Sequence, residues 1–132
     1  MKLLLDTHIW LWSHVDPDRL TPKVAAALES ADTELWLSPI SVWEFLLLAQ
    51  RGRLRVEHDD PQAWVETALS RVPMEDAPIT REVARRSRTV AVPHQDPADR
   101  FLAATAQVFE LTLVTDDVNL LKGRGFAKLP NR

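Results

Sequence analysis

The most regular feature of the sequence is a set of short apolar runs, each ending at a polar or acidic residue. The first run, Leu3 to Leu5, ends directly at Asp6 with no turn residue between them. Because it is apolar without alternation, it predicts a strand buried on both faces, as in a parallel sheet covered by helices. Ligands bind such sheets at the carboxyl ends of the strands. Asp6 is therefore the first candidate site residue.

The alternation of strand-like and helix-like segments continues along the chain. Further strands are predicted at 34–38 and 111–115, with at most a very short strand at 77–79 and an edge strand at 127–130. A short helix is expected after the first strand, and capping residues, several of them followed by proline, predict helices over about 21–31, 38–50, 60–71, 80–91 and 96–109. We therefore expect one domain over 1–132, an α/β fold built as a three-layer α/β/α sandwich with a mostly parallel sheet of four to five strands.

Composition narrows the class of protein. A chain of 132 residues with 45% hydrophobic and 27% charged residues is ordinary for a globular domain. It has no cysteine, which excludes a disulfide framework and a thiolate metal site. No apolar run approaches the roughly 20 residues that span a bilayer, and no signal-peptide pattern is present, so we expect a cytoplasmic protein without a membrane partner. The net charge of −3 argues against a protein that coats nucleic acid non-specifically, but it is compatible with a nuclease whose acidic centre binds metal.

Four acidic positions stand out by their setting. Asp6 and Asp117 follow predicted strands, Glu44 is the single charge within the apolar stretch 40–49, and Asp99 lies one helical turn after Asp96. If the two strands are neighbours, their ends lie about 5 Å apart. Carboxylates at that distance raise each other's pKa unless a cation sits between them. Mg²⁺ or Mn²⁺ suits such oxygen ligands and activates water for hydrolysis.

Each acid also has an ordinary structural explanation. Asp6 and Asp96 stand where a side chain caps a helix, and the helix dipole favours Asp99 in a first turn. Glu44 can face solvent on its helix, and the acidic pair after residue 115 can form a turn. No single position therefore establishes a site.

Together, the order and setting of the acids resemble those of the PIN-domain nucleases, most closely the VapC-like toxins of bacterial and archaeal toxin–antitoxin pairs. The Asp-Pro-x-Asp-Arg block with a preceding histidine and the Ser-x-x-Glu after a strand are specific in combination. The matching stretches extend from residue 3 to residue 117 and are Leu3-Leu4-Leu5-Asp6-Thr7-His8, Ser38-Pro39-Ile40-Ser41-Val42-Trp43-Glu44, His94-Gln95-Asp96-Pro97-Ala98-Asp99-Arg100 and Leu113-Val114-Thr115-Asp116-Asp117.

The resemblance implies a metal-dependent endoribonuclease that hydrolyses phosphodiester bonds in RNA and acts as the toxin of a toxin–antitoxin pair. Family members usually show Thr-x-Asp at the fourth acidic position, whereas this chain also has an acid in the middle, so Asp116 can replace or join its neighbour. Thr7 and Thr115 resemble hydroxyls that support such a site, and Asp96 is expected to support it from outside. The residues to which the resemblance assigns catalysis and the binding of Mg²⁺ or Mn²⁺ are Asp6, Glu44, Asp99 and Asp117.

Basic residues are the candidates for RNA contacts, because they neutralise phosphates. Arg51, Arg53 and Arg100 are predicted to bind RNA, and Arg55 belongs to the same cluster as the first two. For a second cluster, a solvated helix face is at least as good an explanation. This second cluster consists of Arg81, Arg85, Arg86 and Arg88.

The resemblance also implies a homodimer and a small antitoxin protein that binds in a groove near the active site. By analogy, the apolar stretch 40–49 and the segment 10–12 are candidates for that surface. Trp36 and Trp43 are predicted to belong to the core. Trp10 and Trp12, two residues apart on a short helix, cannot share one face, so at least one is expected to be exposed or at an interface.

Other classes fit parts of the pattern. A catalytically silent PIN-like module would bind RNA or protein without cleaving it. A phosphatase of the haloacid dehalogenase type also places an aspartate after its first strand, but it requires a second one two residues later, where this chain has His8. DNA-directed nucleases of the flap-endonuclease group are normally larger.

Overall fold

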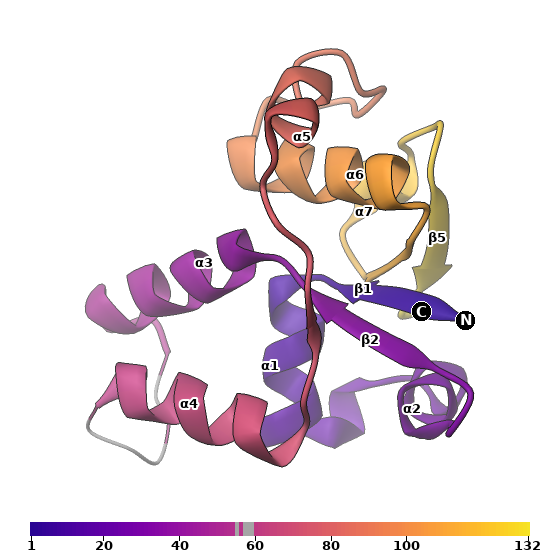
Figure 1. The fold of residues 1–132 in the computed structure, drawn as a ribbon. Coiled ribbons are helices and arrows are strands. Elements are labelled where there is room, and N and C mark those ends of the chain that lie inside the picture. Colours follow the sequence, from indigo (N-terminus) through magenta and orange to yellow (C-terminus); the bar gives the residue numbers. More distant parts are fainter. Residues whose placement is uncertain (55, 57–59) are drawn as a thin grey trace.

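A parallel sheet of five strands forms the centre of the protein, for which the computed structural model describes residues 1–54, 56 and 60–132 (Figure 1). The strand order is β3-β2-β1-β4-β5, and each neighbouring pair is parallel. The strands are β1 (Lys2–Leu5), β2 (Glu34–Leu37), β3 (Glu75–Asp76), β4 (Thr112–Thr115) and β5 (Ala127–Pro130). The predicted α/β class with a parallel sheet is therefore confirmed.

Helices follow the strands and begin where the sequence predicts. Thr21, Ser38, Asp60, Thr80 and Asp96 each accept a hydrogen bond from a backbone N–H of the first helical turn, as expected of N-cap residues. The helical segments are α1 (Thr7–Val15), the 3₁₀ turn η1 (Pro17–Arg19), α2 (Pro22–Glu29), α3 (Pro39–Gln50), α4 (Pro61–Arg71), α5 (Arg81–Arg86), α6 (Pro97–Phe109) and α7 (Val118–Leu121). In the described part of the chain, no helix is long and apolar enough to cross a membrane.

Two predicted boundaries are wrong. The strand expected at 77–79 lies at Glu75–Asp76, because Pro78 has no N–H and cannot continue the ladder after Ala77 donates to the Leu37 carbonyl. The helix expected to reach about residue 91 ends at Arg86. Beyond it the chain runs irregularly over 87–94, and we call this segment the strap.

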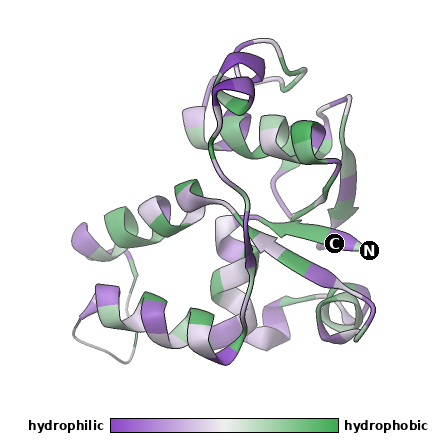
Figure 2. Ribbon diagram, viewed as in Figure 1, coloured by the Kyte–Doolittle hydropathy of each residue, from purple (hydrophilic) through white to green (hydrophobic). Residues whose placement is uncertain are grey.

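The core has two halves, one on each face of the sheet. On β1, Leu3 and Leu5 point into one half, which also contains Trp10 of α1, and Leu4 points into the other. All three leucines have no exposed surface, as the apolar run predicts. Helices α1 and α2 cover the first face, and α6 covers the second together with α5 (Figure 1). Figure 2 shows apolar residues along the strands and hydrophilic ones concentrated on α5.

The tryptophans divide between core and surface differently from the prediction. Trp10 is fully buried, Trp36 is partly buried and stacks on Phe109, and Trp12 is half-buried beneath the Arg19 guanidinium. Trp43 is not a core residue, since 55% of it is exposed. Helix α3 packs the face that carries Ser41 and Phe45 against the protein, and Trp43 lies on the opposite side of the helix.

Candidate acidic active site

The carboxyl ends of β1 and β4 bring two acidic side chains to one edge of the sheet. The strands are direct neighbours, with Leu5 opposite Val114, and the Asp6 N–H donates to the Val114 carbonyl at 3.0 Å. Asp6 is the N-cap of α1 and Asp117 is the N-cap of α7. The capping role and the site position thus coincide, because in a parallel sheet each strand feeds a helix at the same edge.

Thr115 connects these two acids. Its hydroxyl donates to Asp6 Oδ2 at 2.6 Å and accepts from the Asp117 N–H at 3.0 Å. The other oxygen of Asp6, Oδ1, accepts from the Thr7 N–H at 2.7 Å. Each carboxylate oxygen has two lone pairs, so both oxygens of Asp6 keep acceptor capacity for a ligand.

Helix α3 supplies the third acid. The Thr7 hydroxyl donates to Glu44 Oε1 at 2.6 Å, and it lies 3.1 Å from the Ser41 hydroxyl, one turn earlier on α3. Ser41 is fully buried, whereas Glu44 is half-buried. Burial raises the pKa of the Glu44 carboxyl, and the bond from Thr7 only partly opposes this. Glu44 therefore faces the site and not bulk solvent.

The fourth acid, Asp99, lies in the first turn of α6 beside a histidine that our sequence reasoning did not assign to the site. His94 Nε2 is 3.1 Å from Asp99 Oδ2 and 3.9 Å from Asp117 Oδ1. Ligand atoms of these three residues all lie within 4.8 Å of one another. The position of His94 shortly before the Asp-Pro-x-Asp-Arg block was the signal in the sequence that could have identified it.

The charges of the acids act on one another. The pKa of Asp99 is raised to about 8, first by burial and then by the negative charges of Asp6, Asp96, Asp117 and Glu44. The pKa of Asp6 is also raised, mainly by burial, with Asp117 adding to the effect. Carboxyl groups with this mutual repulsion hold protons unless a cation compensates them.

Of the two consecutive acids after β4, Asp117 is the one in the cluster. Its charge raises the pKa of both Asp6 and Asp99, and its Oδ1 faces His94. Asp116 is held instead through its backbone carbonyl, which accepts two bonds from the Arg132 guanidinium. Of these two acids, Asp117 is therefore the one that the structure places beside His94 and Asp99.

The donor set fits a hard divalent cation. Carboxylate oxygens are the ligands that Mg²⁺ and Mn²⁺ prefer, and an imidazole nitrogen is compatible with Mn²⁺. His94 Nδ1 accepts from the Asp96 N–H at 3.1 Å. Its Nε2 is buried and makes no hydrogen bond to any described residue, although Asp99 Oδ2 lies 3.1 Å away. A buried nitrogen without a hydrogen bond, beside carboxyls whose pKa values are raised, is what a cation site presents before its cation binds.

A family model described as "PIN domain" matches this chain over residues 3–125. The chain belongs to the PIN-domain family. It is 34% identical over 125 residues to "Ribonuclease VapC22" of Mycobacterium tuberculosis, and the alignment covers 92% of both sequences.

Solved structures share the fold of this PIN domain. One is VapBC2 from Rickettsia felis bound to a promoter DNA fragment, with a TM-score of 0.73 and 16% identity over 98% of each chain. Another is DNA-bound VapBC from Salmonella typhimurium, with a TM-score of 0.69 and 17% identity over 100% of this chain and 99% of the other. At these identities the likeness concerns the fold alone.

The burial of Arg100 in the PIN domain argues against its predicted role in binding RNA. Only 6% of it is exposed, and its guanidinium donates to four backbone carbonyls of the strap. A buried group whose donors are occupied in this way cannot reach a phosphate. The helix after Thr80 ends where the N–H groups of Arg88 and Thr89 bond to carbonyls only three residues back, those of Arg85 and Arg86, and the next carbonyl, that of Ser87, accepts from Arg100. The four acceptors are the carbonyls of Ser87, Val90, Val92 and His94.

The other arginines predicted to bind RNA are at the surface. Arg51 and Arg53 are exposed just after α3, the helix that carries Glu44. Arg55, which belongs to the same predicted cluster, lies outside the described residues. The second cluster, over 81–88, is on α5 and the start of the strap.

Proposed function

We propose that this PIN domain is a metal-dependent endoribonuclease that hydrolyses phosphodiester bonds in RNA, and that it acts as the toxin of a toxin–antitoxin pair. The observation that carries the proposal is the convergence of four acids from separate elements on one edge of the sheet. Its support from comparison is the 34% identity, over 92% of the chain, to a protein named as a VapC ribonuclease. The residues that would hold the cation are Asp6, Glu44, Asp99 and Asp117, with His94 beside them.

Mg²⁺ or Mn²⁺, when bound, supplies Lewis-acid polarisation of the phosphate and activation of water. The chain's own groups position and deprotonate the reactants. Thr115 holds Asp6 at a constant distance from Asp117, so these two acids are pre-organised. Thr7 occupies only Oε1 of Glu44. The second oxygen of Glu44 would then be available to hold the cation or to orient the attacking water.

A cleavage assay tests the proposal. Purified protein is incubated with total RNA and with transfer RNA, in Mg²⁺, in Mn²⁺ or in EDTA. We expect discrete fragments with either metal and none in EDTA. Asp99→Asn is expected to abolish cleavage, because it removes a ligand charge, whereas Asp18→Asn, the same change at an exposed aspartate of η1, is expected to cut as wild type does.

Intact RNA in every lane, from a folded protein whose melting temperature rises with metal, would favour the silent binding module instead. Cleavage by Asp99→Asn at the wild-type rate would contradict the assignment of the acids. Cleavage that persists in EDTA would contradict metal dependence. The three results therefore test separately whether the protein cleaves RNA, whether the acids carry the cleavage and whether the cleavage needs metal.

We further propose that α3 forms part of the surface that a small antitoxin protein covers. The helix is apolar around most of its circumference, and such helices are normally buried. Trp43 nevertheless has 55% of its surface exposed, and Leu46 and Leu47 are only partly buried. Glu44 lies on the same helix, so a protein bound there would also cover the acids. Trp43→Ala is expected to weaken antitoxin binding at least tenfold, the usual scale for an aromatic anchor.

Two further features belong to the same proposal. Arg51 and Arg53, exposed at the end of α3, are proposed to contact RNA phosphates. A homodimer is the proposed assembly of the toxin, and sedimentation of the purified protein measures it. A monomer at all concentrations would contradict that assembly without affecting the nuclease.

A further inference from the structure

Positive charge is concentrated in two segments of this acidic protein. The whole chain has a net charge of −3, but residues 81–95 contain four arginines and one glutamate. Residues 118–132 contain two arginines and two lysines and no acidic residue. An antiparallel bridge between Ala91 and Arg124 joins the two segments in space. The fold therefore brings Arg124 close to basic residues that are far from it in the sequence, Arg85 and Arg86.

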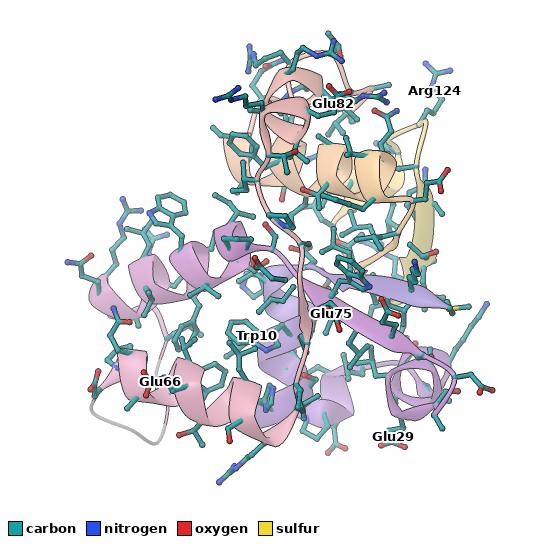
Figure 3. The ribbon with its side chains drawn as sticks, in the orientation of Figure 1. Trp10, Glu29, Glu66, Glu75, Glu82 and Arg124 are labelled. Atoms are coloured by element: carbon teal, nitrogen blue, oxygen red, sulfur yellow. The ribbon has the colours of Figure 1, made fainter. Side chains whose placement is uncertain are left out.

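A groove lies where the segments meet. It has a volume of about 520 Å³ and is lined by α5, the start of the strap, the second half of α6 and the turn before β5. Its lining includes Arg85, Arg86 and Arg124 and contains no acidic residue. Figure 3 shows Arg124 at the same end of the molecule as Glu82 of α5. We call this feature the basic groove.

The arginines of the basic groove are only partly compensated. Arg85 and Arg86 both form salt bridges with Glu82, at 2.8 and 2.7 Å, so one carboxylate serves two guanidinium groups. Arg124 forms no salt bridge within the described residues, and it is exposed. The groove thus keeps an excess of positive charge on arginine, whose planar fork matches a phosphate in two-point hydrogen bonding.

The strap ties the basic groove to the acidic site. The first half of the strap lines the groove through Thr89, Val90 and Ala91, and its last residue, His94, lies beside Asp99. Arg100 bonds to carbonyls along the whole strap, so the two ends are held at a constant separation. Gln107 of the groove follows Asp99 by eight residues on α6, about 12 Å along the helix axis.

We propose that the basic groove binds the phosphate backbone of the RNA substrate on the order of 12 Å away from the bond that is cut. Its lining favours a phosphate chain over a protein partner. Protein interfaces are anchored by aromatic and large apolar side chains, whereas the apolar lining here is limited to Val90 and Ala91. This proposal rests on the proposed function, because it names a second contact of the same substrate.

Binding to a fluorescein-labelled single-stranded RNA, measured by anisotropy without divalent cations, tests the groove. The parent is Asp99→Asn, so that the RNA stays intact. The groove variant adds Arg85→Gln and Arg124→Gln, and the control adds Lys23→Gln and Arg71→Gln, which remove the same charge from exposed positions on α2 and α4. Thermal unfolding of each variant verifies folding.

We expect the groove variant to raise the Kd on the order of tenfold and to lower the slope of log affinity against log salt by about 1.4, or two phosphate contacts. The control should retain the parent Kd within about twofold. With an intact active site, the same groove changes should raise KM for RNA cleavage and leave kcat unaltered, because the groove touches no reacting atom.

Equal losses in the groove variant and the control would overturn the proposal, since net charge alone would explain them. Wild-type cleavage together with unchanged RNA affinity in the groove variant would overturn the groove assignment and leave the nuclease intact. Groove-dependent RNA binding without any cleavage would instead retain the groove and contradict the proposed function. Polyglutamate serves as the second probe: if it, and not RNA, loses affinity in the groove variant, the groove binds an acidic protein.

Discussion

Replacing Arg100 by methionine should destabilise this protein more than replacing any exposed arginine. The guanidinium is 6% exposed and donates through Nε to the Ser87 carbonyl at 2.7 Å. It also donates through Nη2 to Val90 at 3.0 Å and through Nη1 to Val92 and His94, both at 3.2 Å. Methionine fills a similar apolar volume but has no donor, so four strap carbonyls lose their partner.

The magnitude follows from these four bonds. A hydrogen bond to a charged group contributes about 1.5–3 kcal/mol, which gives roughly 6–12 kcal/mol for the four bonds. The change also removes the cost of burying a charge that no described carboxylate pairs with, and this cost of several kcal/mol offsets more than half of the loss. We therefore expect the free energy of unfolding to fall by about 2–4 kcal/mol.

Urea unfolding measures this directly, because a lower midpoint at an unchanged m-value reports lost stability. Arg88→Met is the matched control: it makes the same chemical change at an exposed position of the strap, and we expect a loss below about 0.5 kcal/mol. Arg100→Lys should fall between the two, since one ammonium cannot reach carbonyls that the guanidinium spans with three nitrogens. A loss below about 1 kcal/mol for Arg100→Met would refute the view that this side chain holds the strap.

Two other predictions concern the acids. Asp117→Asn should abolish RNA cleavage in the assay above whereas Asp116→Asn should retain it, since Asp117 faces His94 and acts on Asp99; the reverse result would assign the fourth acidic position to Asp116. The pKa of Asp99, about 8 in the folded protein against 3.8 ordinarily, means that the folded state keeps a proton the unfolded chain loses. Without metal, the stability that this retained proton provides is therefore complete below about pH 4 and is lost as the pH rises through about 8. In urea unfolding, the free energy of unfolding of Asp99→Asn should decline less over this pH range than that of the wild type. Mg²⁺ or Mn²⁺ must displace that proton, so its stabilisation in thermal unfolding should be larger at about pH 8 than at about pH 6, and equal stabilisation at both would contradict the raised pKa.

Local chemistry made most of the fold predictable. A continuous apolar run needs no tertiary information to indicate a strand buried on both faces, and Leu3 to Leu5 are fully buried. A capping side chain followed by proline acts within one helical turn, and the helices beginning after Thr21 and Ser38 start as predicted. Local setting made the acids candidates, because Asp6 and Asp117 follow strands, Glu44 interrupts an apolar helix and Asp99 lies in a first helical turn, but the family resemblance was needed to group them into one site.

Tertiary structure decided what depends on partners distant in the sequence. Nothing in the local sequence separates Arg100, which is buried, from the exposed Arg51, and both were predicted to bind RNA. The carbonyls that bond to Arg100 belong to the strap, which connects α5 to α6, and these two helices pack against each other. Trp43 was placed in the core for a similar reason, since an apolar helix does not reveal which of its faces the protein covers.

The sequence by itself therefore determined the strands and the helix starts, because propensity, capping and apolar burial act over a few residues, and its resemblance to the family supplied the candidate acids. Only the folded chain decided that Asp117 and Asp99 both lie beside His94, and that Arg124 and Arg85 line one groove. Each of these placements brings together residues from separate elements. Strand order and packing set the distances between such residues, and no local sequence pattern specifies them.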